Sequence, residues 1–142
     1  MSAEPAPVST THRLPPPGPA RSAALKLAAI AYATDLLAVI AFAAIGRRSH
    51  DEQGGIGLTF EVAAPFLIGV TVGWAIFRMW QQPLWSNRAI GMWITTIVVG
   101  MALRRLVFDR GIAPSFVIVA TIFLAIFLLG WRLLAQRLKQ QR

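Results

Sequence analysis

The chain has 142 residues, of which 56% are hydrophobic and only 14% charged, and its formal net charge is +8. A typical soluble domain is about 45–50% apolar and about 25% charged, so this composition excludes an ordinary water-soluble fold. The basic residues stand in twos and threes at the ends of apolar segments, where membrane proteins carry Lys and Arg. This spacing argues against a nucleic-acid binder, which would gather them on one face. Cysteine is absent, which excludes disulfides and thiolate metal sites.

The first segment, residues 1–24, is rich in proline and has no apolar core. A signal peptide needs an apolar stretch of about 7–15 residues, so we do not expect one here. A segment of this composition cannot bury enough apolar surface to order itself. The sequence therefore predicts a disordered cytoplasmic tail over residues 1–24.

Four apolar segments follow, and each is long enough, or nearly so, to cross a bilayer, which takes about 20 mainly apolar residues. They predict helices at about 25–46, 58–80, 89–108 and 112–135. The connectors between them are short, so neighbouring helices should run antiparallel. The predicted fold is all-α: a polytopic membrane domain of four antiparallel transmembrane helices over residues 25–135. A basic cytoplasmic tail is expected over residues 136–142.

The basic residues also predict the orientation of the chain. An even number of spans places both termini on one side, and that side carries more Lys and Arg than the other. Cytoplasmic loops carry this excess, so we predict a multi-pass protein of the plasma (cell inner) membrane with both termini cytoplasmic. Trp80, Trp85 and Trp131 fall near that interface and are interpreted as anchors of the aromatic belt.

Asp35 lies close to the middle of the first apolar segment. Ala28, Ala31, Ala38 and Phe42 share its helical stripe, and small residues on one stripe let another helix approach closely. Asp35 should therefore face protein rather than lipid. A carboxylate inside a membrane is costly, which leaves two interpretations: a proton- or cation-binding group, or a structural carboxylate satisfied by a neighbouring helix.

The second segment carries Glu61, Pro65, Gly69 and Gly73 at successive i+4 steps, which form one drifting stripe. Pro65 removes the backbone hydrogen bond to the carbonyl of Glu61, so this point can bind a cation or water, or simply kink the helix. The two glycines form a GxxxG motif, whose usual meaning is close helix packing, within the chain or between chains.

The third segment is short in apolar length, because only 15 residues separate Arg88 from Arg104. Arg104 and Arg105 therefore either reach outward or enter the bundle. Neighbouring helical positions differ by about 100°, so the two cannot face one place. We predict that Arg104 turns inward as the partner of Asp35 and that Arg105 turns towards the interface. The candidate intramembrane ion, proton or structural group is thus Asp35, Glu61 and Arg104.

Charged residues also gather at the opposite, outer end of the predicted bundle. The candidate outer-face cluster comprises Arg47, Arg48, His50, Asp51, Glu52 and Arg105. Mixed signs beside a turn predict ion pairing. One histidine beside two acids does not have a recognised metal-site spacing, and no nucleophile–base pattern or phosphate loop is present. We therefore expect no catalytic residues, no metal and no cofactor.

Several runs carry a family resemblance: Gly46–Glu52 after the helix with Asp35, Pro65–Gly69, Val99–Arg105 and Gly130–Arg132. Together they resemble the domain of unknown function 3054 family, small integral membrane proteins of prokaryotes, over roughly residues 27–135. The resemblance implies a four-helix membrane protein and no assigned activity, and it brings no catalytic residues.

The sequence is compatible with three functions. The first is a small proton- or ion-coupled transport protein using Asp35. The second is a non-catalytic membrane interaction or assembly protein in which an Asp–Arg pair is structural. The third, ranked last, is a membrane enzyme acting on lipids at the outer face. The expected partners are the lipid bilayer and a second copy of the chain, with no nucleic acid and no known small-molecule ligand.

Overall fold

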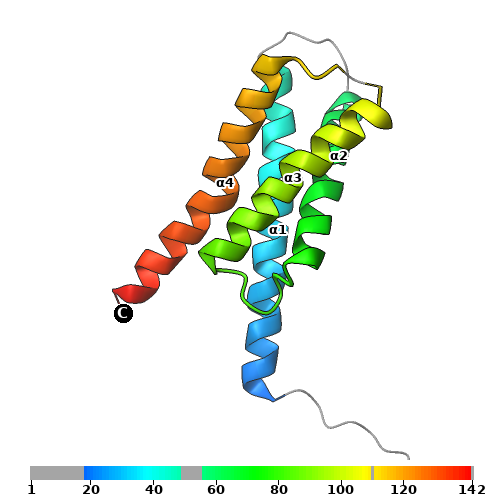
Figure 1. Cartoon of the computed structure of the whole chain (residues 1–142). Helices are drawn as coiled ribbons and strands as arrows, with labels where there is room; N and C mark the ends of the chain where they lie inside the picture. The colour runs from blue at the N-terminus through cyan, green and yellow to red at the C-terminus, as the bar shows by residue number, and fades with distance from the viewer. Residues whose placement is uncertain (1–17, 49–55, 110, 142) are drawn as a thin grey trace, which may run out of the picture.

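The computed structural model describes residues 18–48, 56–109 and 111–141, and these form helices joined by short connectors, without a strand. The helices are α1 (Pro19–Arg48), α2 (Ile56–Ile76), α3 (Ser86–Leu106) and α4 (Pro114–Gln140). They run alternately up and down, with each packed against its sequence neighbour and α4 closing back onto α1 (Figure 1). Each is long and apolar enough to cross a membrane. The predicted all-α, four-helix architecture is confirmed.

At the end of the bundle where α1 begins and α4 ends, both helices extend further than the sequence predicted. α1 begins at Pro19 rather than at about residue 25, so residues 19–24 of the predicted tail are helical. Proline suits the first position of a helix because its missing N–H would have no partner there. α4 continues to Gln140 rather than to about residue 135. Arg137 and Lys139 lie in its last turn, where positive charge interacts favourably with the negative end of the helix dipole.

α2 ends at Ile76, four residues before the predicted end. Arg78 has a left-handed backbone with φ of 47°. Its N–H donates to the Ala75 carbonyl, and the Met79 N–H donates to the Trp74 carbonyl. These two bonds form a Schellman motif, which closes the last turn of a helix, with an arginine at the position that usually holds glycine. Met79 is fully buried behind it, so the apolar residues after Ile76 belong to a turn.

The closest helix contact joins α2 to α3 through glycines. A Cβ atom added at Gly69 would lie 2.7 Å from the Thr96 carbonyl oxygen, and one at Gly73 would lie 3.0 Å from the Met92 carbonyl oxygen. Backbone can approach backbone this closely only where side chains are absent. The GxxxG motif is therefore used for packing inside the chain.

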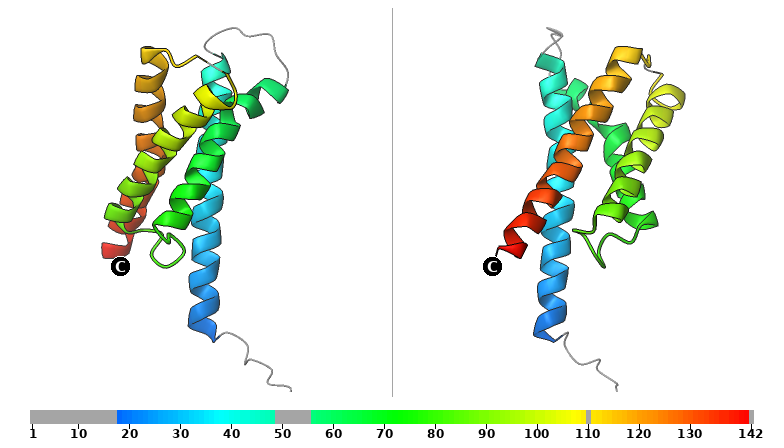
Figure 2. Two further views of the ribbon diagram at one scale, coloured as in Figure 1. Left: turned by 45° about the vertical axis from the view of Figure 1, so that its right-hand side comes forward. Right: turned by 60° about the vertical axis from the view of Figure 1, so that its left-hand side comes forward.

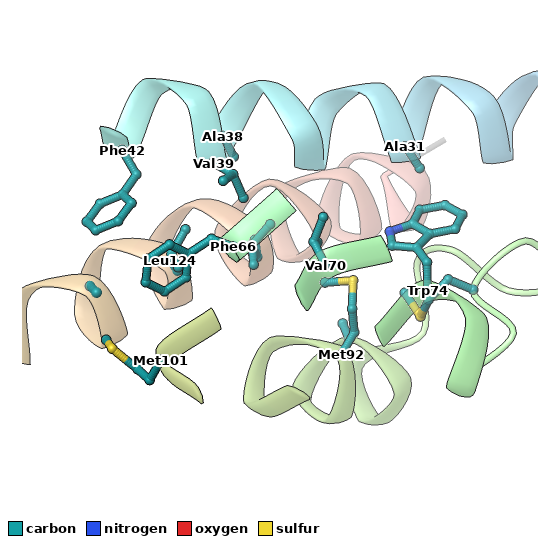
Figure 3. Packing of buried hydrophobic residues seen from close by; sticks show 14 of the residues in the cluster. Ala31, Ala38, Val39, Phe42, Phe66, Val70, Trp74, Met92, Met101 and Leu124 are labelled. Carbon is teal, nitrogen blue, oxygen red and sulfur yellow. The ribbon is translucent and has the colours of Figure 1, made fainter. Parts of the chain in front are cut away.

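The core combines small aliphatic side chains with aromatic rings and methionines. At the outer end, Phe42 of α1 meets Phe66 of α2 at 5.5 Å between ring centroids, and it also meets Phe116 and Phe123 of α4. Figure 3 shows this cluster passing along the bundle through Val70 and Met92 to Trp74, which lies under Ala31. Tyr32 packs edge-on against Trp74. The core therefore joins all four helices along much of their shared length.

Two departures from a regular bundle stand out in Figure 2. The first turns of α2 bend away from the rest of the helix, upstream of Pro65, which lies inside α2. A proline that removes an internal hydrogen bond is a common cause of such a bend. The amino-terminal part of α1 projects well past the connector between α2 and α3, so the middle of α1 is not the middle of the bundle.

The glycine contact gives a direct stability prediction. Gly69→Ala should lower the free energy of unfolding by about 1–3 kcal/mol, the usual cost of overpacking a tight core, because the new methyl group meets backbone that cannot rotate away. The matched control is Gly130→Ala, since a Cβ there would meet nothing within 4 Å. Thermal unfolding in detergent measures both. Equal stability of the two variants would contradict the packing argument.

Candidate functional site

Asp35 is the most deeply buried charged residue of the described helices, with its side chain 0% exposed. The predicted stripe positions it: Ala28, Ala31, Ala38 and Phe42 are all buried on the same face of α1. The small alanines let α2 and α4 come close enough for their side chains to reach the carboxylate. The prediction that Asp35 faces protein is confirmed.

Four hydrogen-bond donors converge on the Asp35 carboxylate. Arg132 of α4 binds it with both terminal nitrogens, Nη1 to Oδ1 at 2.7 Å and Nη2 to Oδ2 at 2.6 Å. The Trp74 indole N–H donates to Oδ2 at 2.7 Å, and the Trp131 indole N–H donates to Oδ1 at 3.0 Å. Each oxygen thus accepts two bonds, which fills the roughly four acceptor sites of an ionised carboxylate.

Arg132 donates hydrogen bonds from each of its three side-chain nitrogens. Its side chain is 1% exposed. Beyond the two bonds to Asp35, its Nε donates to the Pro83 carbonyl at 2.8 Å and its Nη1 to the Leu128 carbonyl at 2.6 Å. The guanidinium also lies over the Trp131 ring, 4.5 Å from the centroid. One side chain therefore ties α4 to α1 and to the α2–α3 connector.

The pair lies near one end of the bundle, not at its centre. Trp74 is in the last turn of α2, and Pro83 is in the connector that follows. Asp35 is midway along α1 only because α1 projects beyond that connector (Figure 2). We call this end, where α1 begins and α4 ends, the terminal end.

Gln136, one turn further along α4, also bonds the α2–α3 connector, as Arg132 does. Its side-chain amide donates to the Leu84 carbonyl and, at 3.2 Å, to the Ser86 hydroxyl. Arg132 and Gln136, at i and i+4, lie on the same face of the helix. Together they hold the connector between α2 and α3 against α4.

Arg104 lies elsewhere. Its guanidinium stacks over the Phe116 ring at 4.1 Å, and its Nε donates to the Gly111 carbonyl at 3.2 Å. Both contacts are at the α3–α4 connector, at the outer end. The predicted pairing of Asp35 with Arg104 is therefore wrong, because Arg132 occupies that place. Arg105 is exposed, as predicted, and pairs with Asp109 at 3.3 Å.

Among the other predicted site residues, the structure describes the side chain of Glu61, which does not join Asp35. Glu61 is exposed on the first turns of α2, whereas Pro65, Gly69 and Gly73 of the same stripe are buried. Arg47 and Arg48 end α1, and His50, Asp51 and Glu52 lie outside the described residues, as does any pairing among them. Within the described ranges, no three His, Cys, Asp or Glu side chains come together.

Trp131 also differs from its predicted role. The sequence predicts an interface anchor, whereas in the structure the Trp131 indole N–H donates a hydrogen bond to Asp35. Trp131 therefore belongs to the site. Trp80 and Trp85 are 47% and 50% exposed, as interface anchors would be.

Sequence reasoning missed Arg132 because it counted this residue among the basic residues of the interface. The structure shows why Arg132 takes this place. Ala120, Leu124, Leu128 and Arg132 follow one another at i+4 steps and are the buried residues of α4. An arginine that continues a buried stripe is aimed into the bundle, and the buried acid on α1 is its natural partner.

Comparison with protein families adds an identity to this geometry. Residues 32–135 match the family described as protein of unknown function (DUF3054). The chain belongs to this family. The matched part contains Asp35, Trp74, Trp131 and Arg132, so the whole site lies within the family domain. No curated protein and no solved structure shows significant similarity to the chain.

The pair should behave as one unit in stability measurements. Asp35→Asn and Arg132→Gln should each lower the free energy of unfolding by about 3–5 kcal/mol, because each leaves an opposite charge buried without its counter-charge. The double variant should be clearly more stable than the sum of the two losses predicts. Thermal unfolding of the four proteins in one detergent completes the cycle. Strictly additive losses would mean that the two side chains do not act together.

Proposed function

We propose that this four-helix membrane protein is a non-catalytic membrane interaction protein, in which the Asp35–Arg132 pair fixes the arrangement of the helices. The observation that carries this proposal is the saturation of Asp35 by four donors, with its side chain fully buried. A buried ion pair with all its hydrogen bonds satisfied can define which helices pack together, in which register.

The same observation weighs against the alternative, a proton- or ion-coupled transporter that uses Asp35. A coupling carboxylate must accept and release its ion during each cycle. The guanidinium group of arginine stays charged in proteins. Neutralising Asp35 would therefore leave the buried guanidinium of Arg132 without a counter-charge. That state is strongly unfavourable. Transport through Asp35 would therefore require the helices to separate at the terminal end.

The polar groups of the described helices support a structural role as well. The Tyr32 hydroxyl bonds that of Thr71 at 2.9 Å between α1 and α2, and the Trp93 indole donates to the Thr121 carbonyl at 3.2 Å between α3 and α4. Each of these bonds holds one helix against another. We expect a partner to be bound by segments outside the bundle, namely the charged connector at 47–52 or the proline-rich amino-terminal segment.

Transport and interaction can be separated by one set of proteins. A photo-reactive amino acid in the connector should crosslink the chain to one defined partner in cells. The crosslink should persist in the Asp35→Asn/Arg132→Gln double variant, provided that it folds, and vanish when residues 47–52 are scrambled. Proteoliposomes of the same variants report flux. Proton- or cation-driven uptake by the wild type that the folded double variant lacks would refute the proposal in favour of transport.

We further propose that the chain resides in the plasma membrane with both termini in the cytoplasm. This rests on the excess of Lys and Arg at the terminal end. Because the chain has no cysteine, single cysteines can be introduced without background. A cysteine replacing Gln141 should react with an impermeant maleimide only after the cells are opened, and one replacing Gly111 should react in intact cells. The reverse pattern would invert the topology.

A further inference from the structure

A groove opens at the terminal end of the bundle, beside the buried pair. It is shallow and open, with a volume of about 700 Å³. The α2–α3 connector forms one wall, the last turns of α4 form the other, and Leu27 of α1 contributes an apolar edge. Arg132 holds the two walls together from behind, and Gln136, which lines the groove, joins them within it. The groove is thus built by the same contacts that organise the fold.

The polar groups of the groove suit an anionic, hydroxyl-bearing ligand. Lys139 supplies an ammonium group, and Gln82 and Gln140 supply amides that both donate and accept hydrogen bonds. All three side chains are exposed. Leu27, Leu84 and Trp85 line the same groove, so apolar and polar surfaces meet in it as they do in a lipid.

The surrounding charge has one sign. Residues 18–34, 74–95 and 125–141 contain no Asp or Glu, and Asp35 is neutralised by Arg132. The basic residues at this end that remain apart from Arg132 are Arg21, Lys26, Arg78, Arg88, Arg137 and Lys139. Basic residues near a membrane surface attract anionic lipids, at about 1 kcal/mol per residue.

We propose that this groove binds one anionic phospholipid whose headgroup carries hydroxyl groups, of the phosphatidylglycerol type. Lys139 contacts the phosphate, the glutamine amides contact the headgroup hydroxyls, and the acyl chains leave past Leu27 and Trp85. The ligand is a lipid rather than a free phosphate ester because the groove lies at one end of helices long and apolar enough to span a membrane and has an apolar edge at Leu27. The proposal does not depend on the interaction function above.

The test is a titration of the full chain, purified in mild detergent, with phosphatidylglycerol or phosphatidylcholine, followed by native mass spectrometry. One phosphatidylglycerol should be retained per chain, with an affinity at least about tenfold above that for phosphatidylcholine. Lys139→Gln should weaken phosphatidylglycerol binding about fivefold, the effect of one basic residue at an anionic surface. The matched control is Arg137→Gln, which removes an exposed charge from the same turn of α4 but does not line the groove; it should change the affinity less than about twofold.

A second variant tests the headgroup contact without changing charge. Gln82→Leu should reduce the affinity for phosphatidylglycerol to that for phosphatidylethanol, a phosphodiester of the same charge that lacks the headgroup hydroxyls. The proposal is overturned if the two charge variants weaken binding equally, because attraction would then be general to the surface. It is also overturned if phosphatidylcholine binds as well as phosphatidylglycerol, or if glycerol phosphate competes at the concentration of the lipid.

Discussion

A carboxylate and a guanidinium that are both shielded from solvent persist only where every polar atom has a partner, and this constraint organises the terminal end of the bundle. Removing either charge from water is costly, and their mutual attraction offsets that cost only when the remaining hydrogen bonds are also made. Here α1 supplies the acid, α4 the base and a second indole, and α2 the first indole. The connector after α2 supplies a carbonyl for the remaining guanidinium nitrogen. Any other register between α1 and α4 would leave buried charge unsatisfied.

The two ends of the bundle are held by different forces. The outer end is joined by aromatic rings of α1, α2 and α4, which pack in several arrangements at similar energy. The terminal end is joined by directed, charge-assisted bonds, which do not. Between them, backbone contact at Gly69 and Gly73 fixes α3 against α2. In a membrane, lipid is as apolar as the helix faces, so association depends on such close packing and polar contacts. We infer that the directed bonds at the terminal end set the register of the helices. The aromatic packing at the outer end then adapts to that register.

The fold could be predicted from the sequence because apolar length and short connectors leave few alternatives for a membrane chain. The buried stripe around Asp35 could also be predicted, because its alanines recur at helical spacing. What could not be predicted was the partner. Arg104 and Arg132 both lie near the end of an apolar run, and choosing between them needs the relative height of the helices. That height depends on the projection of α1 and on the early end of α2 at Arg78, where an arginine takes the left-handed place of a glycine. This helix end goes with the tertiary packing of the buried Met79, which no local sequence pattern predicts.

The buried pair also shapes the surface above it. Because Arg132 neutralises Asp35, the other charged side chains at the terminal end are all basic in the part of the chain that the structure describes. An unbalanced basic face attracts anions over about a Debye length. The same arginine, with Gln136, draws the α2–α3 connector onto α4 and so forms the walls of the groove. The shape of the groove and the charge around it thus both follow from one internal contact. Loss of the Asp35–Arg132 pair should therefore loosen the groove even though neither residue lines it, which ties the lipid-facing chemistry of this end to the packing of the helices beneath.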